Sequence, residues 1–270
     1  MSIKYYLGAL LSIPLLPIMY LQGKRIRASI PKLPEAMGLM GSCRVIDKNV
    51  KSLNLMTIGE STIAGVGVAT HEEGLTGTLA KELSHAMQVN ASWHVYARSG
   101  YTAVNISKKL IPIIEEKNID LIVIGLGGND AFKLNSPRKW TRDVSAVIEQ
   151  LQGKYPNTPI VFINMPPIKE FPAFTPLIKS IVGNLIELLG EALKKTVVRY
   201  ENVYYFGEII TIDTWRSRYN IDPLHAEFFS DGVHPSKLTY QTWAKDIATR
   251  ILSNQSIRAS LELRLINKII

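Results

Sequence analysis

The stretch Leu53-Asn54-Leu55-Met56-Thr57-Ile58-Gly59-Glu60-Ser61 decides the fold. Its apolar residues form a short run that ends at a glycine, which is typical of a buried β-strand followed by a tight turn. A helical spacing of Leu75, Leu79 and Leu83 follows over residues 75–87. The first unit of the chain is therefore predicted to be a strand, a loop and a helix.

The same alternation continues to residue 252. Strands joined by helices of ten or more residues pair in parallel through right-handed crossovers, with helices on both faces of the sheet. The sequence therefore predicts a single three-layer α/β/α sandwich over residues 53–253. Further strands are expected at residues 93–97, 121–126, 160–164 and 203–206, and further helices at residues 103–116, 138–151, 177–196 and 236–252.

The composition limits the classes of function. The chain has 270 residues, 46% of them hydrophobic, and a net charge of +8. Cys43 is its only cysteine, so neither an internal disulfide nor a cysteine metal cluster is possible. Residues 1–54 carry +6 of the net charge. Basic residues beside an apolar run are typical of a segment that lies at anionic lipid headgroups. The sequence contains no nucleic-acid-binding motif, so nucleic acid is not an expected partner.

The N-terminal segment is expected to contact a membrane. Tyr5 to Gln22 are 18 residues without a charge, a helix of roughly 27 Å, just enough to cross a bilayer. We expect an uncleaved anchor over residues 1–26 and a linker over residues 27–52, with the catalytic domain on the cytoplasmic face because the basic residues follow the run. There are two alternatives to a spanning anchor. The segment could be a signal peptide that is cleaved when the protein is exported, or a helix that is kinked at Pro14 and Pro17 and lies in the membrane interface. The tail, residues 254–270, either packs on the domain or rests on lipid.

Two motifs lie at the ends of predicted strands. Ser61 follows the first strand, and Gly127-Gly128-Asn129-Asp130 follows the third. The carboxyl ends of parallel strands share one edge of a sheet, so these motifs are expected to lie together. Far downstream, Asp231-Gly232-Val233-His234 places an acid and an imidazole within one turn of backbone. A serine hydroxyl needs such an imidazole to take its proton and a carboxylate to orient the ring, which predicts a nucleophilic hydrolase.

These motifs, together with Ser99-Gly100, resemble those of the SGNH hydrolases, also called the GDSL esterase and lipase family. The resemblance covers residues 53–252 and implies a flavodoxin-like sheet of five parallel strands in the order 2-1-3-4-5, and hydrolysis of acyl esters. It implies that Ser61 is the nucleophile, His234 the general base and Asp231 the residue that orients His234. It further implies an oxyanion hole made by the backbone N–H groups of Ser61 and Gly100 and the side-chain amide of Asn129. Glu60 and Thr62 depart from the usual Asp and Leu of the family.

We therefore expect a membrane-attached serine esterase that needs no metal or organic cofactor and acts on small-molecule or lipid esters, lysophospholipids included. A glycan O-acetyl esterase or acetyltransferase with the same residues is one alternative, and a non-catalytic membrane-tethered module is another. The loop at Met165-Pro166-Pro167, with Phe171 and Phe174, is a candidate acyl-binding wall. The remaining histidines are expected to be surface or packing residues, although His225 is near enough in sequence to line the site: His71, His85, His94 and His225.

Overall fold

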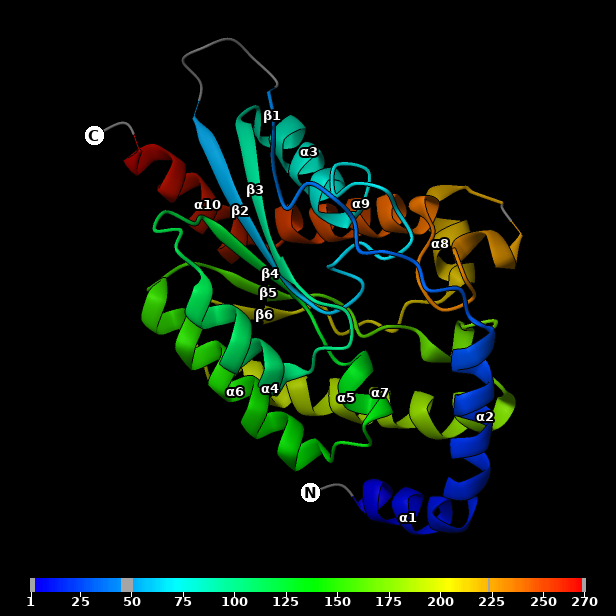
Figure 1. The fold of residues 1–270 in the computed structure, drawn as a ribbon. Coiled ribbons are helices and arrows are strands. Elements are labelled where there is room, and N and C mark those ends of the chain that lie inside the picture. The colour runs from blue at the N-terminus through cyan, green and yellow to red at the C-terminus, as the bar shows by residue number, and fades with distance from the viewer. Residues whose placement is uncertain (1–2, 45–50, 223, 269–270) are drawn as a thin grey trace.

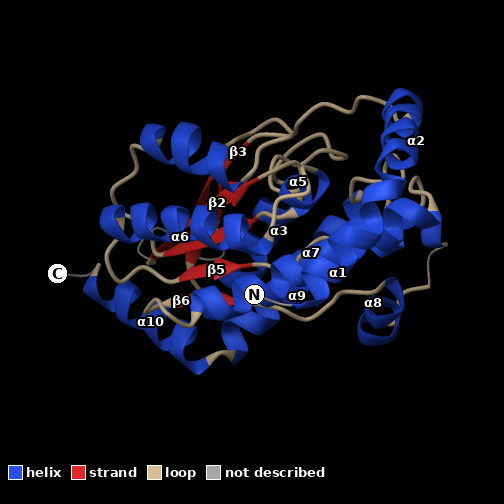
Figure 2. Cartoon of the chain, turned by 90° about the horizontal axis from the view of Figure 1, so that it is seen from below, coloured by secondary structure: helices blue, strands red, loops and turns tan. Residues whose placement is uncertain are grey.

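The computed structural model describes residues 3–44, 51–222 and 224–268. Its centre is one sheet in the order β1-β3-β2-β4-β5-β6, with helices on both faces (Figures 1 and 2). This is an α/β fold with a mainly parallel sheet, as predicted. The strands are β1 (Met40–Cys43), β2 (Ser52–Gly59), β3 (Asn90–Ala97), β4 (Leu121–Gly125), β5 (Ile160–Phe162) and β6 (Val203–Tyr205).

The five strands from β2 to β6 are all parallel, and their spatial order is the predicted 2-1-3-4-5. Gly59 at the end of β2 is level with Ala97 of β3 and Gly125 of β4. The loops that follow these three strands therefore begin at the same level along the strand direction, at the carboxyl edge of the sheet. Every residue of β4 is buried, as expected for a parallel strand covered by helices on both sides.

One strand corrects the expected five-stranded sheet. β1 lies in the segment expected to be a linker and pairs antiparallel with the outer edge of β3, so that Met40 lies opposite His94. Its four residues, Met-Gly-Ser-Cys, alternate between exposed and half-buried positions and include no apolar run, which explains why the sequence pattern missed it. Residues 45–50 of the same segment lie outside the described residues.

The helices form two layers with separate apolar cores. α3 (Leu75–Met87), α9 (Lys237–Ser253) and α10 (Gln255–Asn267) cover one face of the sheet, and α6 (Pro137–Lys154) and α7 (Pro176–Val197) cover the other. The predicted helix at residues 103–116 is shorter and irregular: α4 (Ala103–Asn105) runs into a π-turn and a 3-10 turn at Pro112, which has no N–H to donate. Two short helices were not predicted, α5 (Gly128–Phe132) and α8 (Ile212–Tyr219).

The two ends of the chain both contact the domain. In the tail, Ile257, Leu261 and Leu265 of α10 are buried in the core, so this segment packs on the domain, while Leu263 and Ile266 are exposed. At the N-terminus, α1 (Ile3–Ser12) and α2 (Leu16–Ser29) are separated by a 3-10 turn at Ile13–Leu15, where the expected break at Pro14 and Pro17 occurs. Residues Tyr5–Ser29 form an apolar helical segment that is long and apolar enough to cross a membrane, as a signal sequence or an anchor would be.

Candidate active site

The loops after β2, β3 and β4 are hydrogen-bonded to one another at the carboxyl edge of the sheet. The N–H of Glu60 donates to the carbonyl of Gly125 (3.1 Å), and the N–H of Arg98 donates to the carbonyl of Gly59 (3.2 Å). These bonds extend the ladder by one residue beyond the strands. They bring together the loops that carry Ser61, Gly100 and Asn129, as expected from the strand order.

Asp231 and His234 form a close pair within one turn. One oxygen of the Asp231 carboxylate accepts the backbone N–H groups of Val233 (2.9 Å) and His234 (2.7 Å), and the other lies 2.7 Å from Nδ1 of the His234 ring. Burial by itself would raise the pKa of Asp231, but these hydrogen bonds outweigh it and the pKa is lowered. Asp231 is therefore an anion that holds Nδ1 of the imidazole and leaves Nε2 as the ring atom available for other chemistry.

The His234 loop packs directly on the Ser61 loop. Gly67, at the end of the Ser61 loop, has φ +108°, and a Cβ there would lie 2.4 Å from the carbonyl oxygen of Pro235. The Ser230 hydroxyl donates to the Gly67 carbonyl (3.1 Å), and the buried Tyr240 hydroxyl donates to the Val66 carbonyl (2.8 Å). Glycine is needed at this contact because both the backbone conformation and the space exclude a side chain.

The described residues include no hydrogen bond between the Ser61 hydroxyl and the His234 ring, although their loops are in contact. In hydrolases without bound substrate this bond is often long and tightens only when the substrate arrives. The structure thus brings the Ser61 and His234 loops together and fully forms the Asp231–His234 pair.

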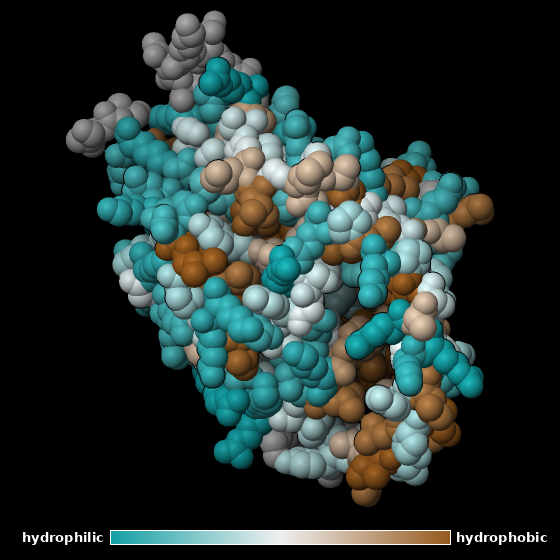
Figure 3. Space-filling view, viewed as in Figure 1, coloured by the Kyte–Doolittle hydropathy of each residue, from teal (hydrophilic) through white to brown (hydrophobic). Residues whose placement is uncertain are grey.

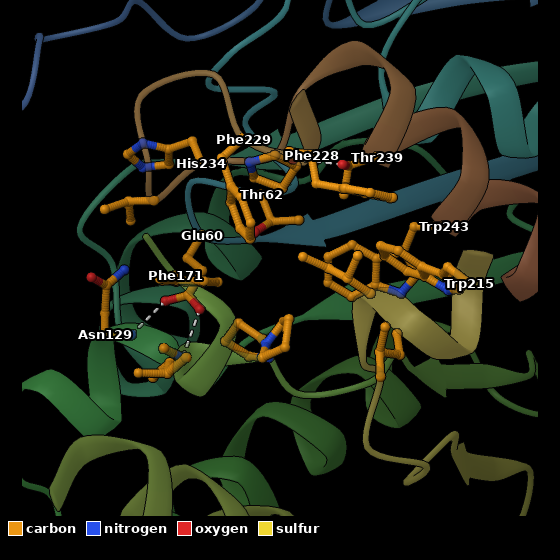
Figure 4. A pocket seen from close by; sticks show the side chains of 18 of the residues that line it. Glu60, Thr62, Asn129, Phe171, Trp215, Phe228, Phe229, His234, Thr239 and Trp243 are labelled. Atoms are coloured by element: carbon orange, nitrogen blue, oxygen red, sulfur yellow. Dashed lines mark hydrogen bonds between the residues drawn. The ribbon is translucent and has the colours of Figure 1, made fainter. Parts of the chain in front are cut away.

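Glu60 joins the nucleophile loop to the loop after β4. Its two carboxylate oxygens accept the backbone N–H groups of Gly128 (2.8 Å) and Asn129 (2.9 Å), the dashed lines in Figure 4. The side chain is buried, and burial raises its pKa to about 7 against the lowering effect of these two bonds. Sequence reasoning did not find this role. The only signal in the sequence was a carboxylate next to Ser61 with no obvious partner nearby.

The other oxyanion candidates lie on the same edge. Gly100 has φ +80°, which favours glycine, and its neighbour Ser99 donates its N–H to Glu35 (2.7 Å). The Asn129 amide donates to the carbonyl of Tyr101 (3.1 Å), one residue past Gly100. Asp130 is buried and accepts the N–H of Ala103 (3.0 Å), so it fixes the start of α4 rather than facing substrate.

A mostly apolar cavity extends from this edge toward α8 and α9. It encloses about 690 Å³, with the solvent at its mouth included, and Glu60, Thr62, Asn129 and His234 lie at one end. Trp215 and Trp243 lie at the other end (Figure 4). Ser61 itself does not line it, although both of its neighbours do. The apolar walls between the two ends include Phe132, Pro166, Pro167, Phe171, Ile212 and Phe228.

The other four histidines, all among the described residues, do not line the cavity. His71 is buried, and burial lowers its pKa to about 4, so it is neutral near pH 7. His94 lies 2.7 Å from the carboxylate of Glu116, a partner the sequence did not suggest. His225 lies 3.4 Å from Glu170 and does not line the cavity. Within the described part of the chain, no group of three or more His, Cys, Asp or Glu side chains is placed to hold a metal ion.

Comparisons with known proteins agree with the fold. The fold resembles a family 3 carbohydrate esterase from Clostridium thermocellum (TM-score 0.55, 18% identity, 77% of this chain and 98% of that one). It also resembles the lipase Lip_vut3 from a goat rumen metagenome (TM-score 0.54, 18% identity, 76% and 99%). A GDSL esterase/lipase of Arabidopsis thaliana is 22% identical over 200 residues, 67% of this chain and 81% of that protein. The sequence profile of the GDSL-like lipase/acylhydrolase family matches residues 57–242, and the chain belongs to this family of ester hydrolases.

Proposed function

We propose that this chain is a serine esterase that cleaves carboxylic esters through an acyl-enzyme at Ser61. The observation that carries the proposal is the Asp231–His234 pair at 2.7 Å on a loop that packs against the Ser61 loop at Gly67. A fixed carboxylate–imidazole pair beside a serine is the arrangement that turns a weak hydroxyl nucleophile into a reactive one.

The reaction proceeds in two halves. The Ser61 oxygen attacks the ester carbonyl while Nε2 of His234 takes its proton, and Asp231 stabilises the imidazolium that forms. The tetrahedral intermediate collapses, the C–O bond to the alcohol breaks, and the alcohol leaves with the proton from His234. Water then attacks the acyl-enzyme, gives its proton to His234, and the second intermediate releases the acid and the Ser61 hydroxyl.

The negative charge of each intermediate falls on the former carbonyl oxygen. We assign its stabilisation to the backbone N–H groups of Ser61 and Gly100 and the amide of Asn129, since the loops that carry them are joined at the sheet edge. The Asn129 amide, which donates to the Tyr101 carbonyl in this structure, must turn from that acceptor to the substrate. Preorganised donors of this kind are each worth about 3 kcal/mol of barrier lowering.

The cavity favours esters with an apolar acyl chain. Its walls from His234 to Trp243 are mainly apolar and aromatic, and such a surface gains free energy from each methylene it covers, about 0.8 kcal/mol. Lipid-like esters, including lysophospholipids, fit both this cavity and attachment of the N-terminal segment to a membrane. We further propose that the catalytic domain lies on the cytoplasmic face, because basic residues follow the segment.

A panel of chromogenic esters of increasing acyl length tests this function. We expect kcat/KM to rise with length from the acetate, by up to about fourfold per methylene while the chain remains within the cavity. A preference for acetate, or acetyl transfer to a sugar in place of hydrolysis, would favour the glycan alternative. The absence of turnover with every ester, together with no labelling by a fluorophosphonate, would favour a non-catalytic module.

Glu60 gives a prediction specific to this chain. In Glu60→Gln the side chain can accept only one of the two N–H groups, so Asn129 is held less firmly, and we expect kcat to fall about tenfold with KM nearly unchanged. Asn129→Ala, which removes the donor itself, should cost more, about 10² to 10³ in kcat. An equal rise in KM in both variants would argue that they disturb substrate binding instead.

The same substitution should remove a pH-dependent penalty on folding. Because the pKa of Glu60 is raised from 4.5 to about 7, folding is penalised progressively as the pH rises from 4.5 through 7, by about 3 kcal/mol at most above that range. The Tm of Glu60→Gln relative to the wild type should therefore increase between about pH 5 and pH 8. A Tm difference that does not change with pH would indicate that Glu60 is ionised throughout this range.

A further inference from the structure

The N-terminal segment presents a concentrated apolar surface. Of the twenty large apolar residues that are exposed in the described chain, nine fall within residues 6–21. Soluble surfaces rarely gather apolar side chains in this way unless something covers them. The nine residues are Tyr6, Leu7, Leu10, Leu11, Ile13, Leu16, Ile18, Tyr20 and Leu21.

The opposite side of the segment is attached to the domain. Both α1 and α2 contact α7. Tyr5, Met19 and Ile26 pack against the apolar core that lies on the α6 and α7 side of the sheet. The hydroxyl of Thr175, which caps α7, donates to the side chain of Gln22 (2.6 Å). A straight helix that crossed a bilayer would carry Tyr5 far from α7. The bend between α1 and α2 instead lets both helices remain on the domain (Figure 1).

This attachment lies beside the mouth of the cavity. Phe174 precedes Thr175, and its ring lies 5.3 Å from that of Phe132 and 5.5 Å from that of Phe171, both of which line the cavity. Figure 3 shows an apolar recess between the body of the domain and the upright helix α2 at the right. The exposed apolar surface of the segment and the aromatic rim of the cavity therefore lie close together.

The charge next to this surface identifies its partner. α2 carries Lys24, Arg25 and Arg27 after its apolar part, and Glu35 is the first acidic residue of the chain. Lys4 precedes the same apolar run, so cations stand at both of its ends. Such a surface matches a lipid leaflet with anionic headgroups, because the apolar side chains enter the acyl region while the cations remain at the headgroups.

We propose that α1 and α2 lie within one leaflet of an anionic membrane, with both ends of the segment on the side of the catalytic domain, and that the cavity mouth at Phe132, Phe171 and Phe174 faces this leaflet. Esters then enter the cavity acyl chain first from the bilayer. This substrate route rests on the proposed esterase function, whereas the placement of the segment does not. The substrate class is single-chain esters that reside in the membrane.

Topology is tested with the full chain on sealed phosphatidylcholine–phosphatidylglycerol vesicles. With the catalytic domain outside, a tag at the N-terminus should be removed by external protease as readily as one at the C-terminus. A protected N-terminal tag would show that the segment spans the bilayer and would overturn the proposal. Flotation with the vesicles should be lost when phosphatidylglycerol is omitted and the salt is raised.

Access to substrate is tested by the ratio of two rates, turnover of a lysophospholipid in vesicles and turnover of a soluble short ester. Leu10→Ser with Leu11→Ser should lower this ratio at least about tenfold, because two leucines leave the leaflet. Ile113→Ser with Val198→Ser replaces two exposed apolar residues elsewhere and should leave the ratio unchanged. Equal ratios in the two double variants would overturn the proposal.

The outcomes separate the two hypotheses. If neither substrate is turned over, the esterase function is wrong, and the tag and flotation results still decide where the segment lies. If the soluble ester is cleaved but the tag is protected, the placement in one leaflet is wrong and the esterase function stands.

Discussion

Ser61→Ala is expected to reduce ester turnover by about 10⁴ to 10⁶ and to abolish labelling by a fluorophosphonate. The hydroxyl is the atom that forms the acyl-enzyme. Of its two neighbours, Glu60 is buried with both carboxylate oxygens bonded to backbone N–H groups. Thr62 lines the cavity, so its hydroxyl is the alternative nucleophile that a control has to exclude. The residual rate should reflect only the oxyanion donors and substrate binding.

Thr62→Val provides the matched control for Ser61→Ala. It removes a neighbouring hydroxyl at nearly constant volume and should retain labelling and most of the turnover. Mass spectrometry of the labelled protein should place the phosphonate on Ser61. A phosphonate on Thr62, or undiminished turnover by Ser61→Ala, would contradict the assignment of the nucleophile.

His234→Ala should cause a loss of similar size, with the fold retained. Without the imidazole, the Ser61 proton loses its acceptor. Loss of the ring frees one oxygen of Asp231, but the other still accepts two backbone N–H groups, and a carboxylate is a much weaker base than an imidazole. Groups that act as a unit are not additive, so Ser61→Ala with His234→Ala should be no slower than either variant alone. The measurements are kcat/KM for a soluble ester and Tm for folding.

His85→Ala serves as the control for this variant, since His85 is exposed and lies on α3 away from the cavity. It should leave both kcat/KM and Tm close to the wild type. Comparable losses in the two variants would show that the assay reports general damage and not a general base. A double variant much slower than either single variant would indicate that Ser61 and His234 act independently.

The sequence predicted the parallel part of the fold well because its signals are local. β4 is a continuous apolar run, β2 is mostly apolar, and α3, α6, α7 and α9 have clear helical spacing, so their positions were predicted to within a few residues. β1 and α8 were missed because their stability comes from packing against distant segments. β1 depends on the edge of β3, and α8 on the packing of Trp215 against Trp243, whose rings lie 6.0 Å apart.

The site was predictable to the extent that each motif follows a strand. The edge shared by Ser61, Gly100 and Asn129 follows from strand order, and the Asp231–His234 pair follows from a separation of three residues. The bonds of Glu60 across to the loop after β4 span 68 and 69 residues, and nothing in the local pattern reveals them. The cavity was only partly predicted, through Pro166, Pro167 and Phe171, because its walls come from segments scattered between residues 60 and 243.

The segment between α2 and β2 also holds two loops of the candidate active site in place. The backbone of Ala36 donates to Ala64 (2.9 Å), that of Met37 donates to Ala69 (3.0 Å), and Glu35 holds the N–H of Ser99 beside Gly100. These three residues, 15 to 17 positions before the first parallel strand, thus hold both the turn after the serine and the turn that carries an oxyanion donor. A recombinant fragment begun at Leu53 would lack these braces, and the smallest unit that keeps the catalytic edge intact starts before Glu35.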